Sequence, residues 1–312
     1  MRPAHIVTSL LVLTIALSGC SDGLSTSQLS APNAMIPPFE RTSMPSDQLT
    51  QQSTTTSPPS ATPVPSVKSP WYVERNILIQ KEIKQYQPWR SMQEISDLVE
   101  KMYIDPDKPM VALTFDDGPV AGVTDHILDV LAQYNVRATF FICGWRLQDQ
   151  EVQGILRRAI ALGCEIGNHT WAHHDLQEQN IVEKKRAIID VNNAVFDATG
   201  YVMHAIRPPG GHNDWDVNRI ARDNDMAVIL WSQSGNVHEY DPEKIAENVQ
   251  KQFVDGKELQ DGDIILLHDT KTHMVDAVKI IVPQLLNKGY QLVTVWELLN
   301  CSEDGFIAGE TY

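Results

Sequence analysis

Val-Ala-Leu-Thr-Phe-Asp-Asp-Gly-Pro, at residues 111–119, is the stretch of sequence that decides the fold. Its apolar run predicts a buried β-strand, and the Gly-Pro pair that ends it predicts a sharp turn. Asp116 and Asp117 stand between the strand and the turn. Adjacent carboxylates repel each other unless a cation or a shared proton lies between them. The stretch therefore predicts a strand that delivers two acidic side chains to a site at its carboxyl end.

Downstream of this strand, short apolar runs alternate with amphipathic stretches of helical length. Strands separated by helices pair in parallel through right-handed crossovers. Six or seven such units could form a closed barrel or an open doubly wound sheet, and periodicity does not choose between these two. The predicted strands are 111–115, 138–142, 164–168, 204–207, 226–231, 263–267 and 291–295. The predicted helices are 124–134, 151–162, 178–198, 214–224, 242–253 and 274–287.

Polar side chains directly follow several of the predicted strands. Asp116 and Asp117 follow the first strand, and His169 follows the third. Arg207 follows the fourth strand, and His268 follows the sixth. The carboxyl ends of parallel strands meet on one face of an α/β fold, where ligands bind. These residues, distant in sequence, are therefore expected to share one cleft.

Two of the histidines are spaced to hold a metal ion. His169 and His173, in Asn-His-Thr-Trp-Ala-His, stand four positions apart, so on a helical turn they would share one face. Together with an Asp from another strand end they make three ligands, which leaves a position open for water. Catalytic metal sites have this arrangement, whereas structural sites are closed.

Two later motifs complete the pattern. Arg-Pro-Pro-Gly-Gly stands at 207–211, and an apolar run at 264–267 ends in His268-Asp269. With the two earlier motifs, and in this order, they resemble the polysaccharide deacetylase family of carbohydrate esterases, also called the NodB-homology family. The resemblance covers about residues 109–300. It implies an α/β fold of the distorted (β/α)₇ barrel type and a hydrolase that removes acetyl groups from a glycan.

The resemblance also implies a metal site and a catalytic base. Asp117, His169 and His173 would hold one divalent metal ion, most often zinc or cobalt in this family, with manganese or nickel as further possibilities. Asp116 would be the general base that takes a proton from the attacking water. Arg207 would pair with Asp116 and keep it in place and ionised.

Further residues would complete the reaction. His268 would protonate the leaving amine, and the backbone N–H of Gly210 would stabilise the oxyanion. Leu266 would help to enclose the acetyl methyl group, with Pro209 and Trp231 as further substrate-binding positions. These parts agree with elementary chemistry, because amide hydrolysis needs an activated nucleophile, stabilised charge on oxygen, and a proton for the nitrogen leaving group.

The sequence departs from the family pattern in two places. The family usually has an Asp shortly after a strand-ending Trp-Ser, where this chain has Ser234, and no Asp-Trp pair follows. Such an Asp would orient and charge the catalytic histidine. Asp241 and Glu239 are candidates to replace it, and spacing does not choose between them. At Gly210 the aromatic residue often found in the third motif is also missing.

Composition excludes several functional classes. The chain has 312 residues, of which 25 are basic and 40 acidic, so its formal net charge is −15. An acidic surface argues against nucleic acid as a partner and against polybasic attachment to lipid. Residues 1–70 carry three basic and three acidic side chains, so the whole excess lies on residues 71–312. Four cysteines are too few for a disulfide scaffold.

The amino-terminal region is expected to target and tether the protein. Residues 1–19 are typical of a lipoprotein signal peptide, because Arg2 precedes an apolar run that ends in Leu-Ser-Gly-Cys. This resemblance to a bacterial lipobox implies cleavage before Cys20 and a lipid on its thiol. An ordinary secretory signal or a short membrane anchor is the alternative. The protein is then expected at the cell envelope, on an extracytoplasmic membrane face, which in a Gram-negative organism means the outer membrane or periplasm.

The remaining segments complete the domain plan. Residues 20–70 are rich in Ser, Thr and Pro and predict a disordered linker. Residues 71–108 predict a short helical extension, 109–301 form the deacetylase domain, and 302–312 form a carboxyl-terminal tail. The expected protein is a monomer with an acetylated glycan as its substrate.

Three functional hypotheses follow from the sequence. The leading one is a metal-dependent N-deacetylase of peptidoglycan, a chitin-like polymer or poly-N-acetylglucosamine. The second is an O-deacetylase of the acetylxylan-esterase type, since the same kind of site hydrolyses esters. The third is a glycan-binding lipoprotein whose turnover is weakened by the altered fourth motif. Intact candidates for the metal ligands, the base and the acid favour an enzyme over the third hypothesis.

Overall fold

The computed structural model describes residues 84, 91–93, 104–105, 107–251, 256–300 and 305–312. The predicted signal peptide, Cys20 and the linker lie outside these residues, as does most of the predicted helical extension. Those assignments remain predictions. None of the described helices is both long and apolar enough to cross a membrane.

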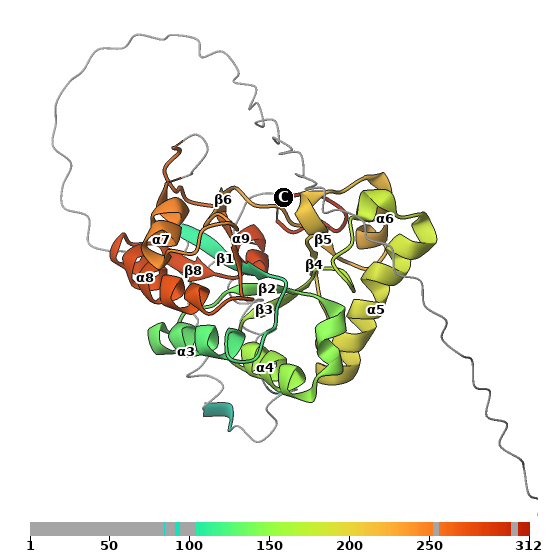
Figure 1. Cartoon of the computed structure of the whole chain (residues 1–312), viewed down its shortest axis with the longest axis horizontal. Helices are drawn as coiled ribbons and strands as arrows, with labels where there is room; N and C mark the ends of the chain where they lie inside the picture. The colour runs from blue at the N-terminus through green and yellow to red at the C-terminus, as the bar shows by residue number, and fades with distance from the viewer. Residues whose placement is uncertain (1–83, 85–90, 94–103, 106, 252–255, 301–304) are drawn as a thin grey trace, which may run out of the picture. The chain divides into compact units, whose positions relative to one another are not determined.

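A single sheet of eight parallel strands lies at the centre of the domain (Figure 1). The strand order is β5-β4-β3-β2-β1-β7-β6, and β8 pairs with the first half of β1. The strands are β1 (Met110–Asp116), β2 (Thr139–Ile142), β3 (Glu165–Asn168), β4 (Ala205–Ile206), β5 (Ala227–Val228), β6 (Gln233–Ser234), β7 (Ile264–His268) and β8 (Gln291–Val293). The expected parallel barrel with helical crossovers is confirmed.

The six helices predicted between residues 124 and 287 are present, with ends that differ by a few residues. The α-helices are α3 (Thr124–Tyr134), α4 (Gln150–Ala161), α5 (Ile181–Thr199), α6 (Trp215–Arg222), α7 (Pro242–Gln250), α8 (His273–Asn287) and α9 (Val295–Asn300). Short 3₁₀ turns, η1 (Gly144–Gln148), η2 (Leu176–Glu178) and η3 (Pro209–Gly211), follow β2, β3 and β4. These turns shape the face on which the strands end.

The two faces of β1 explain why its sequence is apolar at Met110–Leu113 and at Phe115. Val111, Leu113 and Phe115 belong to the larger core cluster, beneath the helices. Met110 and Ala112 belong to a second cluster. Because side chains alternate along a strand, a strand covered on both faces needs apolar residues at successive positions.

Three of the strands differ from the sequence prediction. β4 and β5 are each two residues long, much shorter than the predicted runs, and β6 was not predicted as a strand at all. The chain leaves the sheet soon after each of these strands to build the loops of the active face. The part of the chain that the structure describes therefore holds eight strands, one more than predicted.

The carboxyl-terminal segment lies beside β5. Val228 N–H donates to Glu310 O (2.9 Å), and Leu230 N–H donates to Tyr312 O (2.6 Å). Within the described residues, β5 and β6 end the strand path and do not pair with each other. The predicted tail thus adds backbone pairing at the β5 side of this opening, where the barrel departs from a closed ring.

Buried charges join α9 to the amino-terminal ends of the strands. Arg137 donates from Nε to both carboxylate oxygens of Glu297 (3.1 Å each). Glu165 Oε2 accepts from Thr139 Oγ1 (2.8 Å) and from Trp296 N–H (2.9 Å). Burial raises the pKa of Glu165 to about 7, against the opposing effect of these hydrogen bonds. This cluster lies at the end of the strands opposite to the site described below.

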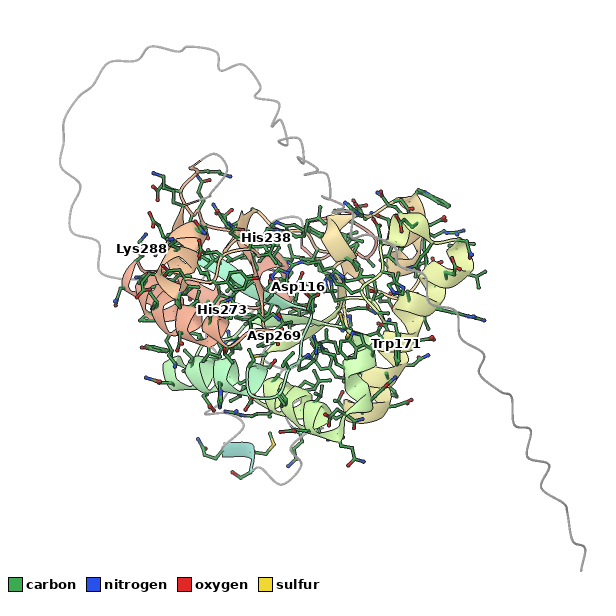
Figure 2. The ribbon with its side chains drawn as sticks, in the orientation of Figure 1. Asp116, Trp171, His238, Asp269, His273 and Lys288 are labelled. Carbon is green, nitrogen blue, oxygen red and sulfur yellow. The ribbon has the colours of Figure 1, made fainter. Side chains whose placement is uncertain are left out.

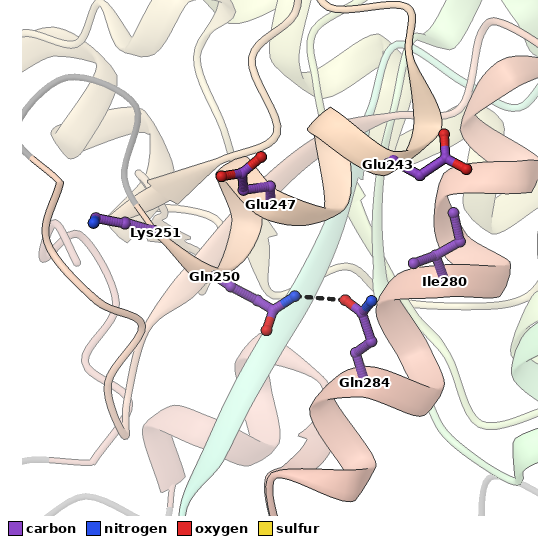
Figure 3. A pocket seen from close by; sticks show the side chains of 6 residues that line it. All are labelled: Glu243, Glu247, Gln250, Lys251, Ile280 and Gln284. Carbon is purple, nitrogen blue, oxygen red and sulfur yellow. Dashed lines mark hydrogen bonds between the residues drawn. The ribbon is translucent and has the colours of Figure 1, made fainter.

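On the outside of the barrel, α7 packs against α8. A shallow hollow between these two helices is crossed by a hydrogen bond from Gln250 Nε2 to Gln284 Oε1 (2.5 Å), as Figure 3 shows. Glu243, Glu247 and Ile280 also line it. The packing of α7 on α8 fixes the two loops that precede these helices, and both loops border the site.

Candidate active site

Asp116 and Arg207 form a buried ion pair at the centre of the strand ends. Arg207 Nη1 donates to Asp116 Oδ1 (2.8 Å) and to Thr114 Oγ1 (2.6 Å). Asp116 and Arg207 are 3% and 0% exposed, respectively, so water screens this charge pair very little. Thr114 and Asp116 lie two positions apart on β1 and therefore face the same side of the strand. Arg207 thus contacts Asp116 directly, and the catalytic role that the resemblance implies for this pair stays a prediction.

The Arg207 guanidinium is held on all sides. Nε donates to Ile229 O (3.1 Å) and Nη2 to Leu230 O (2.9 Å), on the chain just beyond β5. Its carbon lies 4.2 Å from the centroid of the Phe141 ring. Burial lowers the pKa of Arg207, and Asp116 opposes that shift. With so many donors satisfied, the guanidinium is a rigid support for the Asp116 carboxylate.

Asp117, His169 and His173 converge beside this pair. Asp117 Oδ1 lies 3.4 Å from His169 Nε2 and 3.2 Å from His173 Nε2. Burial opposes ionisation of Asp117, but His169, His173 and His268 outweigh it and lower its pKa to about 2. Asp117 has a φ of 74°, in the left-handed region, and Arg146 Nε donates to its carbonyl oxygen.

The hydrogen bond of the other His169 nitrogen fixes which ring atom faces Asp117. His169 Nδ1 lies 2.7 Å from Arg207 O, which can only accept, so Nδ1 carries the proton. Nε2 is then free to present a lone pair. His169 is 2% exposed, whereas the His173 side chain is 46% exposed. One candidate ligand is therefore anchored in the core, and the other lies at the mouth of the site.

The local geometry of the two histidines differs from the prediction. They were expected on one face of a helical turn, but residues 169–175 form a loop. Thr170 and His173 have positive φ values of 67° and 58°. Trp171 N–H donates to Ala187 O (2.8 Å), which ties the loop to α5. The two rings still lie 5.0 Å apart, because loop curvature rather than helical periodicity brings them together.

His268 ends β7 directly beside Asp116. The two residues are paired in the register of β1 and β7, so the base and the acid implied by the resemblance are strand neighbours. Leu266 lies two positions earlier and therefore on the same side of β7. Burial lowers the pKa of His268, and the charges of Asp116 and Asp117 oppose the shift without reversing it.

Neither proposed replacement for the missing carboxylate serves His268. Glu239 Oε1 accepts from the N–H groups of Tyr240 (2.9 Å) and Asp241 (3.0 Å). Asp241 caps the start of α7 by accepting from Glu243 N–H (3.0 Å). Ser234 Oγ accepts from Asn236 N–H (3.1 Å). All three side chains therefore stabilise their own loop instead.

The remaining predicted residues line one wall of the site. Gly210 in η3 has a φ of 65°, which favours glycine, and its N–H has no acceptor among the described residues. Pro209 is buried beneath it. Trp231 is half-buried, with its ring centroid 5.7 Å from the Arg207 guanidinium carbon. A Cβ on Gly211 would approach the Trp231 ring to 3.1 Å, so this turn packs directly on the indole.

Sequence reasoning missed Asp269 as a supporting residue. Its buried carboxylate accepts from Thr124 Oγ1 (2.5 Å), and burial raises its pKa to about 7. A Cβ on Gly118 would lie 2.1 Å from this carboxylate, which explains the glycine after Asp117. The feature of the sequence that could have identified Asp269 was its position directly after His268, at the end of an apolar strand. Thr114 was also missed, although its spacing from Asp116 placed it on the same face.

Comparison with known proteins assigns the family. Residues 103–229 match the family model described as Polysaccharide deacetylase. A peptidoglycan-N-acetylglucosamine deacetylase of Bacillus cereus is 33% identical over 193 residues, which cover 61% of this chain and 88% of that relative. The chain belongs to the polysaccharide deacetylase family.

Solved structures of relatives are also similar to this chain. The peptidoglycan-N-acetylmuramic acid deacetylase PdaC of Bacillus subtilis is 36% identical over 220 residues, 70% of this chain. The match spans 44% of PdaC, less than half of its length. The PdaC structure matches with a TM-score of 0.59 at 33% identity, covering 64% of this chain and 95% of the solved one.

An enzyme named for a different substrate, acetylated xylan, is also similar to this chain. The family 4 acetyl xylan esterase from Clostridium thermocellum, solved in complex with a cobalt ion, has a TM-score of 0.58 and 30% identity. The match covers 65% of this chain and 97% of that structure. The shared fold thus accompanies both peptidoglycan deacetylases and an esterase, so fold alone does not select the substrate.

The polar atoms of the candidate site fit a divalent cation. One ligand atom from each of Asp117, His169 and His173 lies within 4.8 Å of the others. Asp117 Oδ1 is buried and has no hydrogen-bond partner among the described residues. A buried carboxylate oxygen without a donor, facing two imidazole nitrogens, is the donor set that zinc and similar ions prefer.

Proposed function

We propose that this deacetylase removes N-acetyl groups from an amino-sugar polysaccharide outside the cytoplasm, using one divalent metal ion. Peptidoglycan, chitin-like oligomers and poly-N-acetylglucosamine are the candidate polymers. The similarity to relatives named as peptidoglycan deacetylases favours peptidoglycan. The observation that carries the proposal is the register of β1 and β7, which sets Asp116 beside His268 at the edge of the three possible metal ligands.

The residues divide the reaction between them. A divalent cation bound by Asp117, His169 and His173 would supply a Lewis acid for water and the amide oxygen. Asp116, held by Arg207, accepts a proton from the attacking water. The N–H of Gly210 is placed to donate to the oxyanion. His268 delivers a proton to the nitrogen, and the products are acetate and a free amine.

Acetate release from a substrate panel tests the proposal. The zinc-loaded protein from residue 71 onward should release acetate from N-acetylated glycan oligomers, and a chelator should abolish the release. Asp116→Asn should lower turnover by at least about 100-fold, since a positioned general base contributes that much. Folded, metal-loaded protein with no acetate release from any N-acetylated glycan would refute the proposal.

An O-deacetylase remains the second candidate, favoured by the similarity to the acetyl xylan esterase. Acetylated xylan belongs in the same panel for this reason. Faster release from xylan esters than from every N-acetylated oligomer would support the second candidate. Loss of both activities in Asp116→Asn would show that one site performs them.

The location of the enzyme is also a proposal. The relatives named for peptidoglycan act on a cell-wall polymer, which supports an extracytoplasmic site of action. We infer that a lipid on Cys20 tethers the protein to a membrane facing that compartment. The linker at residues 20–70 would then set the distance between the membrane and the catalytic domain.

A further inference from the structure

A hydrogen bond joins two loops of the candidate site at their outer ends. The loop after β3 carries the candidate metal ligand His173 and ends at Asp175. The η3 turn after β4 carries Gly210 and ends at His212. His212 Nδ1 lies 2.8 Å from Asp175 Oδ2. This Asp175–His212 bridge therefore connects the loop of a candidate metal ligand to the turn of the proposed oxyanion donor.

The bridge lies on the side of the site opposite His268. In the strand order, β3 and β4 lie on one side of β1, and β7, which ends in His268, lies on the other. Figure 2 shows the same division, with Trp171 of the β3 loop toward α5, His273 at the start of α8, and Asp116 between them. A sugar whose nitrogen meets His268 therefore has the bridge on its other side.

The Asp175 carboxylate fixes the protonation of the His212 ring. Asp175 Oδ1 also accepts from Gln177 N–H (2.9 Å). Burial opposes ionisation of Asp175, but the hydrogen bonds from Gln177 and His212 outweigh it and lower its pKa. An ionised carboxylate only accepts, so His212 Nδ1 carries the proton. In the neutral ring Nε2 then presents a lone pair, and no hydrogen bond among the described residues uses it.

The His212 ring lies against the face of Gly210 on which a side chain would begin. A Cβ on Gly210 would meet His212 Cε1 at 3.4 Å, Nδ1 at 3.5 Å and Nε2 at 3.7 Å. These nearly equal distances indicate that the ring turns its face toward that position. The imidazole thus covers the turn where this chain lacks an aromatic residue. Because two bonds link a Cβ to its backbone nitrogen, Nε2 lies at most about 7 Å from the Gly210 nitrogen.

The bridge is ordered and still open to solvent. His212 N–H donates to Pro209 O (3.3 Å), and Asp214, which caps α6, accepts from Val217 N–H (3.0 Å). The side chains of His212 and Asp175 are nevertheless 43% and 33% exposed. A polar atom held in place at the surface binds a ligand with little loss of conformational entropy. The carboxylate behind the ring also makes Nε2 a stronger acceptor and repels anions, so a neutral hydroxyl group suits it.

We propose that His212 Nε2 accepts a hydrogen bond from a hydroxyl group of the sugar that carries the reacting acetamido group, and that Asp175 positions the ring for this contact. The inference rests on the proposed N-deacetylase activity and adds a substrate-binding residue to it. The contact holds the sugar on the Gly210 side while its nitrogen faces His268.

Deoxy substrates test this contact directly. The parent substrate is the N-acetylated oligomer of the panel that the wild-type protein hydrolyses fastest, and each analogue lacks one hydroxyl group of the reacting sugar. On the parent, His212→Ala should lower kcat/KM about tenfold, the size of one neutral hydrogen bond. One analogue should cost the wild-type protein the same factor. His212→Ala should lose nothing further on that analogue, which identifies the bound hydroxyl group.

Two further variants separate binding of the sugar from support of the turn. Asp175→Ala leaves the ring in place but releases its orientation, so it should show part of the loss on the parent and none on the identified analogue. His212→Gln, whose amide oxygen can accept in place of Nε2, should recover part of the activity. Bound zinc should be unchanged in every variant.

His126→Ala is the matched control. His126 also lies beside an aspartate, with Nε2 3.9 Å from Asp125 Oδ2, but its side chain is 58% exposed on α3. This variant should keep the wild-type kcat/KM on the parent and on every analogue.

The outcomes separate this inference from the function on which it rests. Equal losses in His212→Ala on the parent and on every analogue would overturn the contact and leave N-deacetylation intact, because the ring would then only support the turn. Analogues that all match the parent in the wild-type protein would overturn it as well. The absence of acetate from every N-acetylated oligomer would overturn both proposals. Binding of the parent to Asp116→Asn, measured by calorimetry, should weaken about tenfold when His212→Ala is added.

Discussion

At the scale of single residues, the site is organised by the main-chain oxygen of Arg207. That oxygen accepts from His169 Nδ1, while the side chain of the same residue holds Asp116. One residue thus sets the tautomer of a candidate metal ligand and the position of the proposed base. Replacing Arg207 by Lys would keep the charge but lose the fork of donors that reaches Thr114, Ile229 and Leu230.

The histidine ligands give a direct prediction. His169→Ala and His173→Ala should each remove bound zinc and lower turnover by at least about 100-fold, because each removes one of three candidate ligands. Mutating a residue that only supports a metal ligand already lowers metal affinity or activity by about 10- to 100-fold. His174→Ala, at the exposed neighbour outside the cluster, is the control and should keep both. Metal content per protein and far-UV circular dichroism provide the measurements. Full activity in metal-free His169→Ala would contradict the assignment.

The pH dependence of turnover follows from the environment of His268. Burial lowers the pKa of His268 below the usual value. Because Ser234 stands where the family usually has an Asp, no carboxylate at position 234 opposes this shift. A general acid must be protonated, so activity should fall as pH rises through this lowered pKa. Ser234→Asp should raise the pKa and move the alkaline limb of kcat/KM upward by about one pH unit.

Ser234→Ala separates charge from loop geometry in that experiment. It removes the hydroxyl that accepts from Asn236 N–H without adding a carboxylate, so it should leave the alkaline limb in place. Profiles are measured on one N-acetylated oligomer with metal occupancy checked at each pH. An alkaline limb that is the same in Ser234→Asp would show that position 234 does not reach His268.

Much of the site was predictable from residue types at strand ends, and the exceptions have physical causes. Asp116, His268 and Arg207 meet because parallel strands end on one face, a rule that needs no coordinates. The loop conformation of His169 and His173 was not predictable, because residues in the left-handed region leave no periodic signal. The roles of Glu239 and Asp241 as local caps also depended on turn geometry.

At the scale of elements, the long helices and the well-buried strands were predicted, β4 and β5 were predicted longer than they are, and β6 was not predicted. β1, β2 and β7 are apolar over whole runs, so they stand out in the sequence. β6 is Gln233–Ser234, two polar residues that are strand-like only because β7 lies beside them. Tertiary pairing decides such elements, and a single sequence does not record it.

Glu165 gives a prediction about how α9 is held. Its pKa is raised from 4.5 to about 7 by burial, so between these values the folded state binds more protons than the unfolded state. The contribution of Glu165 to stability is therefore greatest below pH 4.5 and declines as pH rises toward 7. Glu165→Gln, which can still accept from Thr139 and Trp296, should flatten this decline, by roughly 3 kcal/mol at most.

Chemical denaturation at several pH values between 4.5 and 8 measures that slope. Asp269, whose pKa is also raised to about 7, remains in the variant, so the slope should shrink rather than vanish. Glu178→Gln, an exposed acid in η2, is the matched control and should keep the wild-type slope. An unchanged slope in Glu165→Gln would show that this carboxyl is ionised in the folded protein at neutral pH.

At the scale of the whole molecule, the carboxyl-terminal residues support the active site from a distance. Tyr312 pairs with Leu230, whose carbonyl oxygen accepts from Arg207 Nη2. Deleting residues 309–312 should therefore loosen Arg207 and Asp116 and lower kcat by about tenfold or more, with metal content retained. Steady-state kinetics on the zinc-loaded protein measures the effect.

Tyr312→Phe is the control for that deletion. It removes the hydroxyl that bonds Gly305 O (2.8 Å) and Ile307 N–H (2.9 Å) but keeps the backbone pairing with β5. Most of the activity should remain in this variant. A deletion that leaves kcat unchanged would show that Arg207 is positioned by the barrel alone.

The proposed anchor makes a cellular prediction. Cys20→Ala should abolish incorporation of labelled fatty acid and move the protein from the detergent-extracted membrane fraction to the aqueous one. Cys143→Ala, at a buried free thiol, is the control and should leave the labelling unchanged. Lipid label that persists on Cys20→Ala would place the attachment elsewhere.

The backbone pairing of residues 310–312 with β5 has a practical consequence for protein engineering. An affinity tag, fluorescent protein or sortase sequence joined after Tyr312 would begin beside β5. The carbonyl oxygens of Ile229 and Leu230, just beyond β5, accept hydrogen bonds from Arg207. We expect fusions at that position to disturb this pairing, and through it the hydrogen bonds of Arg207, even when the partner domain folds well. Reporters for imaging or immobilisation therefore belong at the other end of the domain, ahead of Ile104.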